Sequence, residues 1–213
     1  MIYYDIHTHQ PSVHPEDITI VNTIIKEDYE LSLPAAYCSV GIHPWYIYNV
    51  REQLSCFESI ISASNVVAIG EAGLDKLAET PLAIQQEVFL KQAELANEKS
   101  KPLIIHCVKA WAELIAARKM VKPQTPWIIH GFRGNGELAQ QLISQGFYLS
   151  FGAYFNPSAL QSAWPERIFA ETDDKKIDIQ AVYQQIASSL HLSLEELASG
   201  LENNVCNIFS IGY

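Results

Sequence analysis

The chain has 213 residues, of which 48% are hydrophobic and 18% are charged, and its formal net charge is −10. A chain of this size can bury one sizeable core, so we expect a single domain over residues 1–213. The negative charge argues against non-specific wrapping of a nucleic-acid backbone, which requires a basic surface. It does not exclude a phosphate substrate at a local site, where bound metal ions dominate the electric field.

The sequence also carries information on the cellular compartment. It contains no stretch long and apolar enough for a transmembrane helix, and no basic region followed by an apolar run at the N-terminus. The four cysteines are scattered without a close pair, as is typical of free thiols in a reducing compartment. We therefore expect a cytoplasmic protein that does not bind membranes and has no obligate protein partner.

Short runs of β-forming residues alternate with helical patterns along the chain. Strands are expected at Tyr3–Ile6, Ile18–Ile24, Tyr37–Ile42, Val66–Ile69, Leu103–Ile105, Trp127–Ile129, Phe147–Phe151 and Arg167–Ala170. Helical spacing of apolar residues predicts helices at Leu82–Lys99, Ala110–Met120, Glu137–Gln145 and Ile177–Leu190. Ser193 and Glu196 have the spacing of a capping box that opens a final helix. The segment between Ile24 and Tyr37 is too short, and too interrupted by proline, for a full helix.

This alternation indicates parallel strand pairing through crossover helices. Several strands, such as Val66–Ile69, are continuously apolar, as expected when both faces of a sheet are buried. Eight candidate strands predict an α/β fold of the (β/α)₈ TIM barrel type, at the small end of its size range. The rival is an open doubly wound sheet, but no glycine-rich phosphate loop follows the first strand, which weakens that alternative.

Ionisable side chains recur at the carboxyl ends of the predicted strands. His7 and His9 end the first strand, and their alternate positions place both rings on one face. Later strands are followed by His43, by Glu71 and Asp75, by His106, by His130, and by Glu171, Asp173 and Asp174. In a barrel these strand ends converge on the face that carries active sites. One histidine after a strand is more often a hydrogen-bonded rim residue than a ligand, so the argument rests on the joint pattern.

That pattern predicts a metal centre, because so many imidazoles and carboxylates on one rim would repel one another or stay unpaired without a cation. Mixed histidine and carboxylate ligation suits zinc, manganese or iron, whereas carboxylate and water suit magnesium. We expect His7, His9 and Asp173 to bind one ion, His106 and His130 to bind a second, and Glu71 to bridge both. Paired ions roughly 3.5–4 Å apart clamp the attacking and leaving oxygens of a displacement. Glu71 and Asp173 are the predicted catalytic residues, with Asp173 accepting a proton from water that the metal acidifies.

The motifs, in this order, resemble those of the TatD-related metal-dependent hydrolases of the amidohydrolase-like barrel superfamily. They are His-x-His, Gly-Ile-His-Pro, Gly-Glu-x-Gly-Leu-Asp, Ile-Ile-His-Cys, Ile-His-Gly-Phe and Glu-Thr-Asp, between Asp5 and Asp173, and Asn204–Phe209 is similar to the family's closing helix. The resemblance implies a distorted TIM barrel with one or two divalent ions. It implies hydrolysis, in many relatives of DNA phosphodiesters, including trimming of 3′ ends. It assigns metal-ligand positions to His7, His9, Glu71, His106, His130 and Asp173.

Residues around the predicted metal shell depart from that family's pattern. Arg133 stands where a serine is common, and Val108 and Lys109 replace an Arg-Asp pair. We assign Lys109 and Arg133 to substrate binding as phosphate-contacting cations, and the alternative is ordinary solvated charge at a helix start. His43 is assigned to substrate phosphate as well, with a donor to a metal ligand or a structural rim histidine as alternatives.

Two aromatic residues in loops after strands are also candidates for substrate contact. Trp45 and Tyr154 either stack on a nucleic-acid base or form apolar contacts over the site, and the apolar contact is the favoured interpretation.

The residues therefore predict a metal-dependent hydrolase that uses one or two Mg, Mn or Zn ions to activate water. The preferred substrate is a phosphodiester of DNA, at a nucleic-acid 3′ end, as in a TatD-type deoxyribonuclease. The first alternative is hydrolysis of a small amide, ester or lactone by the same centre, which the acidic charge and the altered substrate residues keep open. A non-catalytic metal-binding barrel is disfavoured, because six costly polar residues would not be retained without a function.

Overall fold

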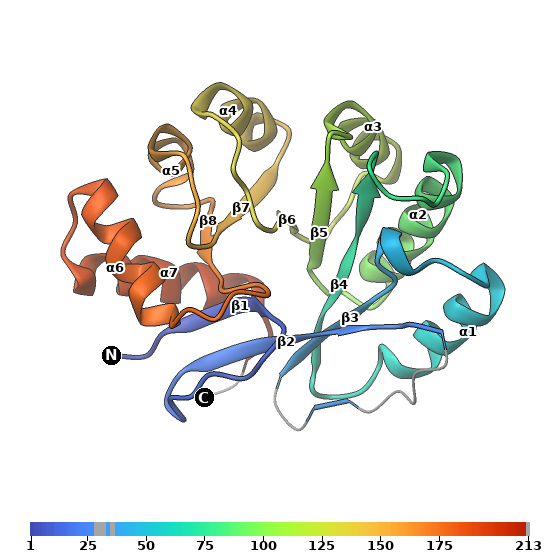
Figure 1. The fold of residues 1–213 in the computed structure, drawn as a ribbon, viewed down its shortest axis with the longest axis horizontal. Coiled ribbons are helices and arrows are strands. Elements are labelled where there is room, and N and C mark those ends of the chain that lie inside the picture. The colour runs from blue at the N-terminus through green and yellow to red at the C-terminus, as the bar shows by residue number, and fades with distance from the viewer. Residues whose placement is uncertain (28–32, 35–36, 212–213) are drawn as a thin grey trace. The chain divides into compact units, whose positions relative to one another are not determined.

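The computed structural model describes residues 1–27, 33–34 and 37–211. Eight strands alternate with helices along the chain, and hydrogen bonds join the strands in the order β1 to β8 (Figure 1). The strands are β1 (Tyr4–Thr8), β2 (Ile18–Ile24), β3 (Cys38–Gly41), β4 (Val66–Asp75), β5 (Leu103–Val108), β6 (Trp127–Ile129), β7 (Phe147–Phe151) and β8 (Ile168–Ala170). The helices are η1 (Pro44–Tyr46), α1 (Val50–Ile60), α2 (Leu82–Glu98), α3 (Trp111–Val121), α4 (Gly136–Ser144), α5 (Pro157–Ala163), α6 (Ile179–Leu190) and α7 (Leu194–Ile208).

The chain forms two compact units. We call residues 1–21 and 128–213 the terminal unit, and residues 22–127 the central unit. In the terminal unit, β1 pairs in parallel with β2 and also forms a parallel bridge from Thr8 to Asp173, just after β8. The first strand therefore lies next to the last, and the strands pair in sequence order. This arrangement is that of the predicted (β/α)₈ TIM barrel. The expectation of one domain over residues 1–213 stays a prediction.

All eight predicted strands are present, but β1, β4 and β5 run further than predicted. They reach Thr8, Asp75 and Val108, so His7, Glu71 and His106 lie inside strands. The extension of β4 depends on Gly73, which pairs with His106 and approaches it so closely that a Cβ would collide with the His106 carbonyl oxygen. Glycines that suggest a loop in the sequence thus permit two strands to touch, and this contact brings Glu71 towards His106.

The helices predicted from apolar spacing are all present. The predicted final helix, α7, begins with the capping box, because Ser193 Oγ accepts a hydrogen bond from Glu196 N and Glu196 Oε2 accepts one from Ser193 N. Helices α1 and α5 were not predicted. Each begins at an asparagine N-cap, Asn49 and Asn156, and Pro157 occupies the first turn of α5. These are ordinary start signals, so the two helices could have been found from the sequence.

Apolar side chains fill each unit's interior. In the terminal unit, Phe147, Phe169 and Tyr183 are fully buried, and α7 packs against β1 and β8. In the central unit, Phe89 and Trp127 lie edge to face with ring centroids 5.3 Å apart. Across the described part of the chain, no helix combines the length and apolar character needed to cross a bilayer. The predicted segment between Ile24 and Tyr37 includes residues 28–32 and 35–36, which lie outside the described residues.

Candidate metal centre

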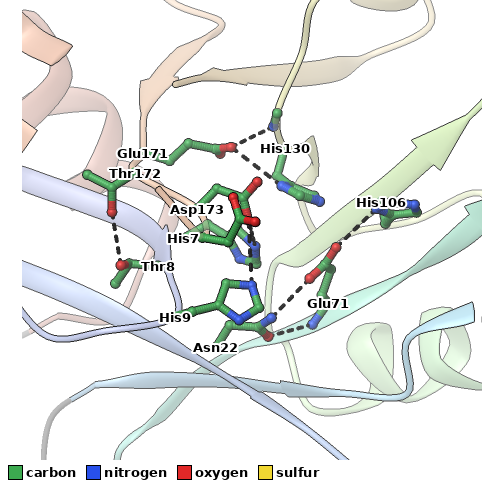
Figure 2. A network of polar contacts seen from close by, with 12 residues as sticks. His7, Thr8, His9, Asn22, Glu71, His106, His130, Glu171, Thr172 and Asp173 are labelled. Carbon is green, nitrogen blue, oxygen red and sulfur yellow. Dashed lines mark hydrogen bonds and ion pairs between the residues drawn. The ribbon is translucent and has the colours of Figure 1, made fainter. Parts of the chain in front are cut away.

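In the terminal unit, main-chain pairing brings His7, His9 and Asp173 together. Asp173 N donates to His7 O at 2.9 Å, and His9 N donates to Asp173 O at 3.0 Å. This register places the Asp173 carboxylate near both imidazoles, and the dashed lines in Figure 2 mark the two contacts. Nε2 of His7 and Nε2 of His9 lie 3.6 and 3.5 Å from Asp173 Oδ1. The structure therefore brings together all three residues that were predicted to share the first ion.

The geometry and charge of this group fit a divalent cation. Ligands bound at about 2.0–2.2 Å around a tetrahedral ion lie roughly 3.3–3.6 Å from one another, which matches the donor distances in this group. Burial acts to raise the pKa of Asp173, but the imidazoles of His7 and His9 outweigh it and hold this pKa well below its ordinary value. The carboxylate is therefore ionised at neutral pH and offers a full negative charge to a cation.

His130 and Glu171 lie beside these residues, and we call the five together the Asp173 cluster. The rings of His7 and His130 have centroids 4.3 Å apart. Glu171 is fully buried, and its Oε1 accepts a 2.6 Å hydrogen bond from Gly131 N and lies 3.4 Å from His130 Nδ1 (Figure 2). Glu171 thus positions the imidazole of His130 and the main chain of Gly131.

Asp5 is a supporting residue that was not singled out in the sequence. Its Oδ1 accepts hydrogen bonds from Thr172 N at 3.1 Å and His7 N at 3.3 Å, and its Oδ2 accepts one from Thr172 Oγ1 at 2.6 Å. Burial raises the pKa of Asp5 to about 7. Asp5 thus ties β1 to the residue that precedes Asp173. The available signal was a lone carboxylate inside an otherwise apolar strand.

In the central unit, Glu71 lies next to His43 and His106, and we call these three residues and Asp75 the Glu71 cluster. His43 Nε2 and His106 Nδ1 each lie 3.1 Å from Glu71 Oε1. Asn22 holds the rest of the glutamate, because its Nδ2 donates to Glu71 Oε2 and its Oδ1 accepts from Glu71 N, both at 3.0 Å (Figure 2). Asn22 was not predicted, and no local motif marks it.

Asp75 determines which nitrogen of His106 faces Glu71 as an acceptor. Asp75 Oδ2 lies 2.9 Å from His106 Nε2 and accepts a 2.6 Å hydrogen bond from Trp45 Nε1. Burial acts to raise the pKa of Asp75, but hydrogen bonds from His106, Leu77 N and Trp45 outweigh it and hold the pKa below its ordinary value. When the His106 ring is neutral, an ionised Asp75 favours the proton on Nε2, so that Nδ1 presents its lone pair to Glu71. Two acceptors 3.1 Å apart repel unless a proton or a metal ion lies between them, so this donor set also fits a divalent cation.

The same reasoning gives His43 a different role. His43 Nδ1 accepts a hydrogen bond from Trp45 N at 3.1 Å, at the start of η1. A neutral His43 ring then carries its proton on Nε2 and donates it to Glu71 Oε1. This geometry supports His43 as a residue that positions Glu71. Its predicted contact with substrate phosphate stays a prediction.

The remaining predicted substrate residues are on the surface. Lys109, in the central unit, is exposed and has a left-handed backbone with φ 55°. Arg133, in the terminal unit, is exposed, and its guanidinium carbon lies 5.6 Å from the centroid of the Tyr154 ring. Both cations are accessible to an anion, but their assignment to phosphate stays a prediction, as does the sharing of one ion by His106 and His130.

Comparisons with known proteins agree with this fold and with a metal-dependent hydrolase. The chain is 30% identical over 198 residues to a Bacillus subtilis protein named uncharacterized metal-dependent hydrolase YabD, covering 82% of this chain and 78% of that one. It is 28% identical over 148 residues to an Edwardsiella piscicida protein named 3′-5′ ssDNA/RNA exonuclease TatD, covering 64% of this chain and 57% of the relative. The crystal structure of YjjV, a TatD homologue from Escherichia coli K12, superposes with a TM-score of 0.79 over 99% of this chain and 98% of that one, at 22% identity.

The sequence model of the family described as TatD related DNase matches residues 7–210, which is nearly the whole chain. The predicted fold and the predicted class, a metal-dependent hydrolase that acts on ester bonds, are confirmed at the level of the family. This chain belongs to the TatD-related DNase family.

Proposed function

We propose that this protein hydrolyses phosphodiester bonds at the 3′ end of single-stranded nucleic acid, with divalent ions (Mg²⁺, Mn²⁺ or Zn²⁺) held by the Asp173 cluster and by the Glu71 cluster. The observation that carries the proposal is the pair of similar donor sets. Asp173 Oδ1 faces Nε2 of His7 and of His9 at 3.6 and 3.5 Å. Glu71 Oε1 faces Nδ1 of His106 at 3.1 Å and is positioned by His43. The choice of nucleic acid rests on the family and on the name of the Edwardsiella relative.

The residues of the Asp173 cluster supply charge and fixed donors. His7 and His9 direct Nε2 at the Asp173 carboxylate, whose lowered pKa keeps it ionised over the working pH range. A carboxylate with such a lowered pKa is a good anionic ligand but a weak base. The predicted proton acceptance by Asp173 therefore stays a prediction, whereas its role as a ligand has direct geometric support.

The residues of the Glu71 cluster hold one glutamate oxygen towards a histidine lone pair. Asn22 fixes Glu71 Oε2, and Asp75 keeps the proton on His106 Nε2. A divalent ion, when bound, supplies positive charge that polarises a phosphoryl oxygen and acidifies water. Bridging of two ions by Glu71 stays a prediction.

The proposal is tested with purified protein that has been stripped of metal and reloaded separately with Mg²⁺, Mn²⁺ or Zn²⁺. The substrate is a single-stranded oligodeoxynucleotide with a 5′ fluorophore, and the products are resolved by length. We expect stepwise shortening from the 3′ end with at least one metal and none after chelation. If the protein binds metal but releases no nucleotide with any of the three ions, or cleaves only a panel of amides, esters and lactones, the proposed substrate is wrong.

We also propose a cytoplasmic location, supported by the four scattered cysteines and their typical reducing compartment. A fluorescent fusion compared with a cytoplasmic marker tests it, and enrichment in another compartment would contradict it.

A further inference from the structure

The exposed ring of Trp45, at the border of the Glu71 cluster, is unusual because the residue is anchored and yet uncovered. The residue is 58% exposed. Its indole N–H nevertheless points inward and donates a 2.6 Å hydrogen bond to Asp75 Oδ2. A tryptophan has one apolar face and one polar atom, which suits it to sites where one end is held and the other is wet. Here the hydrogen bond holds a broad aromatic surface in contact with solvent.

The neighbours of Trp45 are the imidazoles of the Glu71 cluster. The Trp45 ring lies edge to face with His43, with centroids 5.2 Å apart, and with His106, with centroids 5.8 Å apart. The indole therefore lies beside the imidazoles that face Glu71. A nucleotide whose phosphate is bound near Glu71 can place its base on this exposed ring.

A cation lies over the ring of Tyr46, the residue that follows Trp45. Tyr46 follows Trp45 in η1, its ring lies 5.7 Å from that of His43, and Lys26 Nζ lies 4.3 Å above the Tyr46 ring. Lys26 is exposed and available to a nucleic-acid backbone. In a chain with net charge −10, such a local cation next to an aromatic surface is the combination that single-strand-binding sites use.

We propose that Trp45 is a base-stacking residue, which holds the base of a bound nucleotide while Asp75 fixes the orientation of its ring. This inference rests on the proposed function and adds to it the part of the substrate that the protein recognises. Asp75 then has two tasks, because its Oδ2 both accepts the indole N–H and contacts His106 Nε2. Stacking tolerates any base, so the site recognises that a base is present but does not discriminate among the four bases.

The test measures binding separately from hydrolysis. The probe is a 5′-fluorescein single-stranded oligodeoxynucleotide whose 3′-terminal linkages are phosphorothioates, which slow cleavage. It is made in two forms, one with a normal 3′-terminal nucleotide and one with an abasic 3′-terminal nucleotide. Fluorescence anisotropy with Mn²⁺-loaded protein gives the dissociation constant of each form.

We expect wild-type protein to bind the normal form about 5- to 150-fold more tightly than the abasic form, the range that one base stack supplies. Trp45→Leu should bind both forms as weakly as the wild type binds the abasic form. Trp45→Phe keeps a ring without the N–H and should retain part of the preference. Leu77→Ala is the matched control, since it removes an exposed apolar side chain near Asp75 and should retain the full wild-type ratio.

Equal affinity of the wild type for the two forms would overturn the inference even if Trp45→Leu failed to fold. An equal weakening of both forms in a folded Trp45→Leu would also overturn it, because that pattern belongs to a structural role. Cleavage of the unmodified strand is followed in parallel. Base-dependent binding without cleavage would support the stacking site and contradict the proposed nuclease function. Cleavage with base-independent binding would support the nuclease function and contradict the stacking site.

Discussion

The Glu71 cluster and the Asp173 cluster contain the same kinds of donor atoms, but they are held in different ways. In the Glu71 cluster, side chains orient side chains, since Asp75 fixes His106 and Asn22 fixes Glu71. In the Asp173 cluster, main-chain pairing of β1 with the segment after β8 sets the positions of the donors. Loss of an orienting side chain should therefore lower metal affinity in the first cluster and folding stability in the second.

The largest effect is expected from Asp173→Asn, which removes the charge that both His7 and His9 face. We expect hydrolysis to fall by roughly 10³-fold or more, since a metal site supplies several kcal/mol of catalysis, and the Asp173 cluster to lose its ion. Steady-state cleavage and elemental analysis measure the two effects. Asp174→Asn is the matched control, because Asp174 is exposed and pairs with Lys175 at 2.6 Å. Equal activity of the two variants would remove Asp173 from the mechanism.

Asp5→Ala tests the claim that the Asp173 cluster depends on backbone register. It leaves the buried donors Thr172 N, Thr172 Oγ1 and His7 N without their acceptor. We expect the free energy of unfolding to fall by about 3 kcal/mol, since each such group costs roughly 1–3 kcal/mol. Urea denaturation of metal-free protein measures the change, and Asp5→Asn, which keeps one acceptor oxygen, should lose less. If the stability of the variant is unchanged but its metal affinity falls, then Asp5 acts on metal binding and not on folding, contrary to this expectation.

Asp75→Asn tests the Glu71 cluster in the same way. An amide can still accept the Trp45 N–H, but it no longer holds the His106 proton with a full negative charge. We expect metal affinity at the Glu71 cluster to fall about 10- to 100-fold, the usual cost of losing such a partner. Competition with a chromophoric chelator measures the affinity. Glu113→Gln is the control, since it removes a carboxylate charge of the same unit that pairs with Lys76 at 2.7 Å.

The smallest effect concerns a carboxylate–histidine pair that lies outside both clusters. His14 Nε2 lies 2.7 Å from Asp178 Oδ2, and this contact raises the pKa of His14 above 6.5. The pair therefore favours the folded state below the ordinary pKa of histidine and loses this effect as the pH rises through the raised value. Asp178→Asn retains a side-chain oxygen for the N-cap of α6, which accepts from Gln180 N, and removes the charge. NMR titration of the imidazole should show a lower pKa in the variant, and an unchanged pKa would show that Asp178 has no influence.

The sequence predicted the strands and the long helices well, because buried parallel strands are continuously apolar and long helices show clear spacing. It placed the end of β4 at Ile69 instead of Asp75, since Gly70 and Gly73 have the composition of a loop. Only the pairing of Gly73 with His106 reveals that these glycines serve close strand contact. Helices α1 and α5 are short and were missed despite their asparagine caps.

For the candidate site, the sequence identified the residues whose chemical type is itself the signal. His7, His9 and Asp173 do lie together, and so do Glu71 and His106. The supporting residues were harder to find, because Asn22 and Asp5 belong to no motif and act through hydrogen bonds across strands. Asp75 was recognised as an ionisable residue after a predicted strand, and the structure adds its 2.9 Å contact with His106.

The most direct test of the account is anomalous scattering from crystals loaded with Mn²⁺ or Zn²⁺ and measured at the absorption edge of the metal. The account predicts one peak within coordination distance of His7 Nε2, His9 Nε2 and Asp173 Oδ1. It predicts another within coordination distance of His106 Nδ1 and Glu71 Oε1. Absence of anomalous density at both donor sets, in protein that cleaves a single-stranded oligonucleotide in a metal-dependent manner, would contradict the assignment of the metal centre.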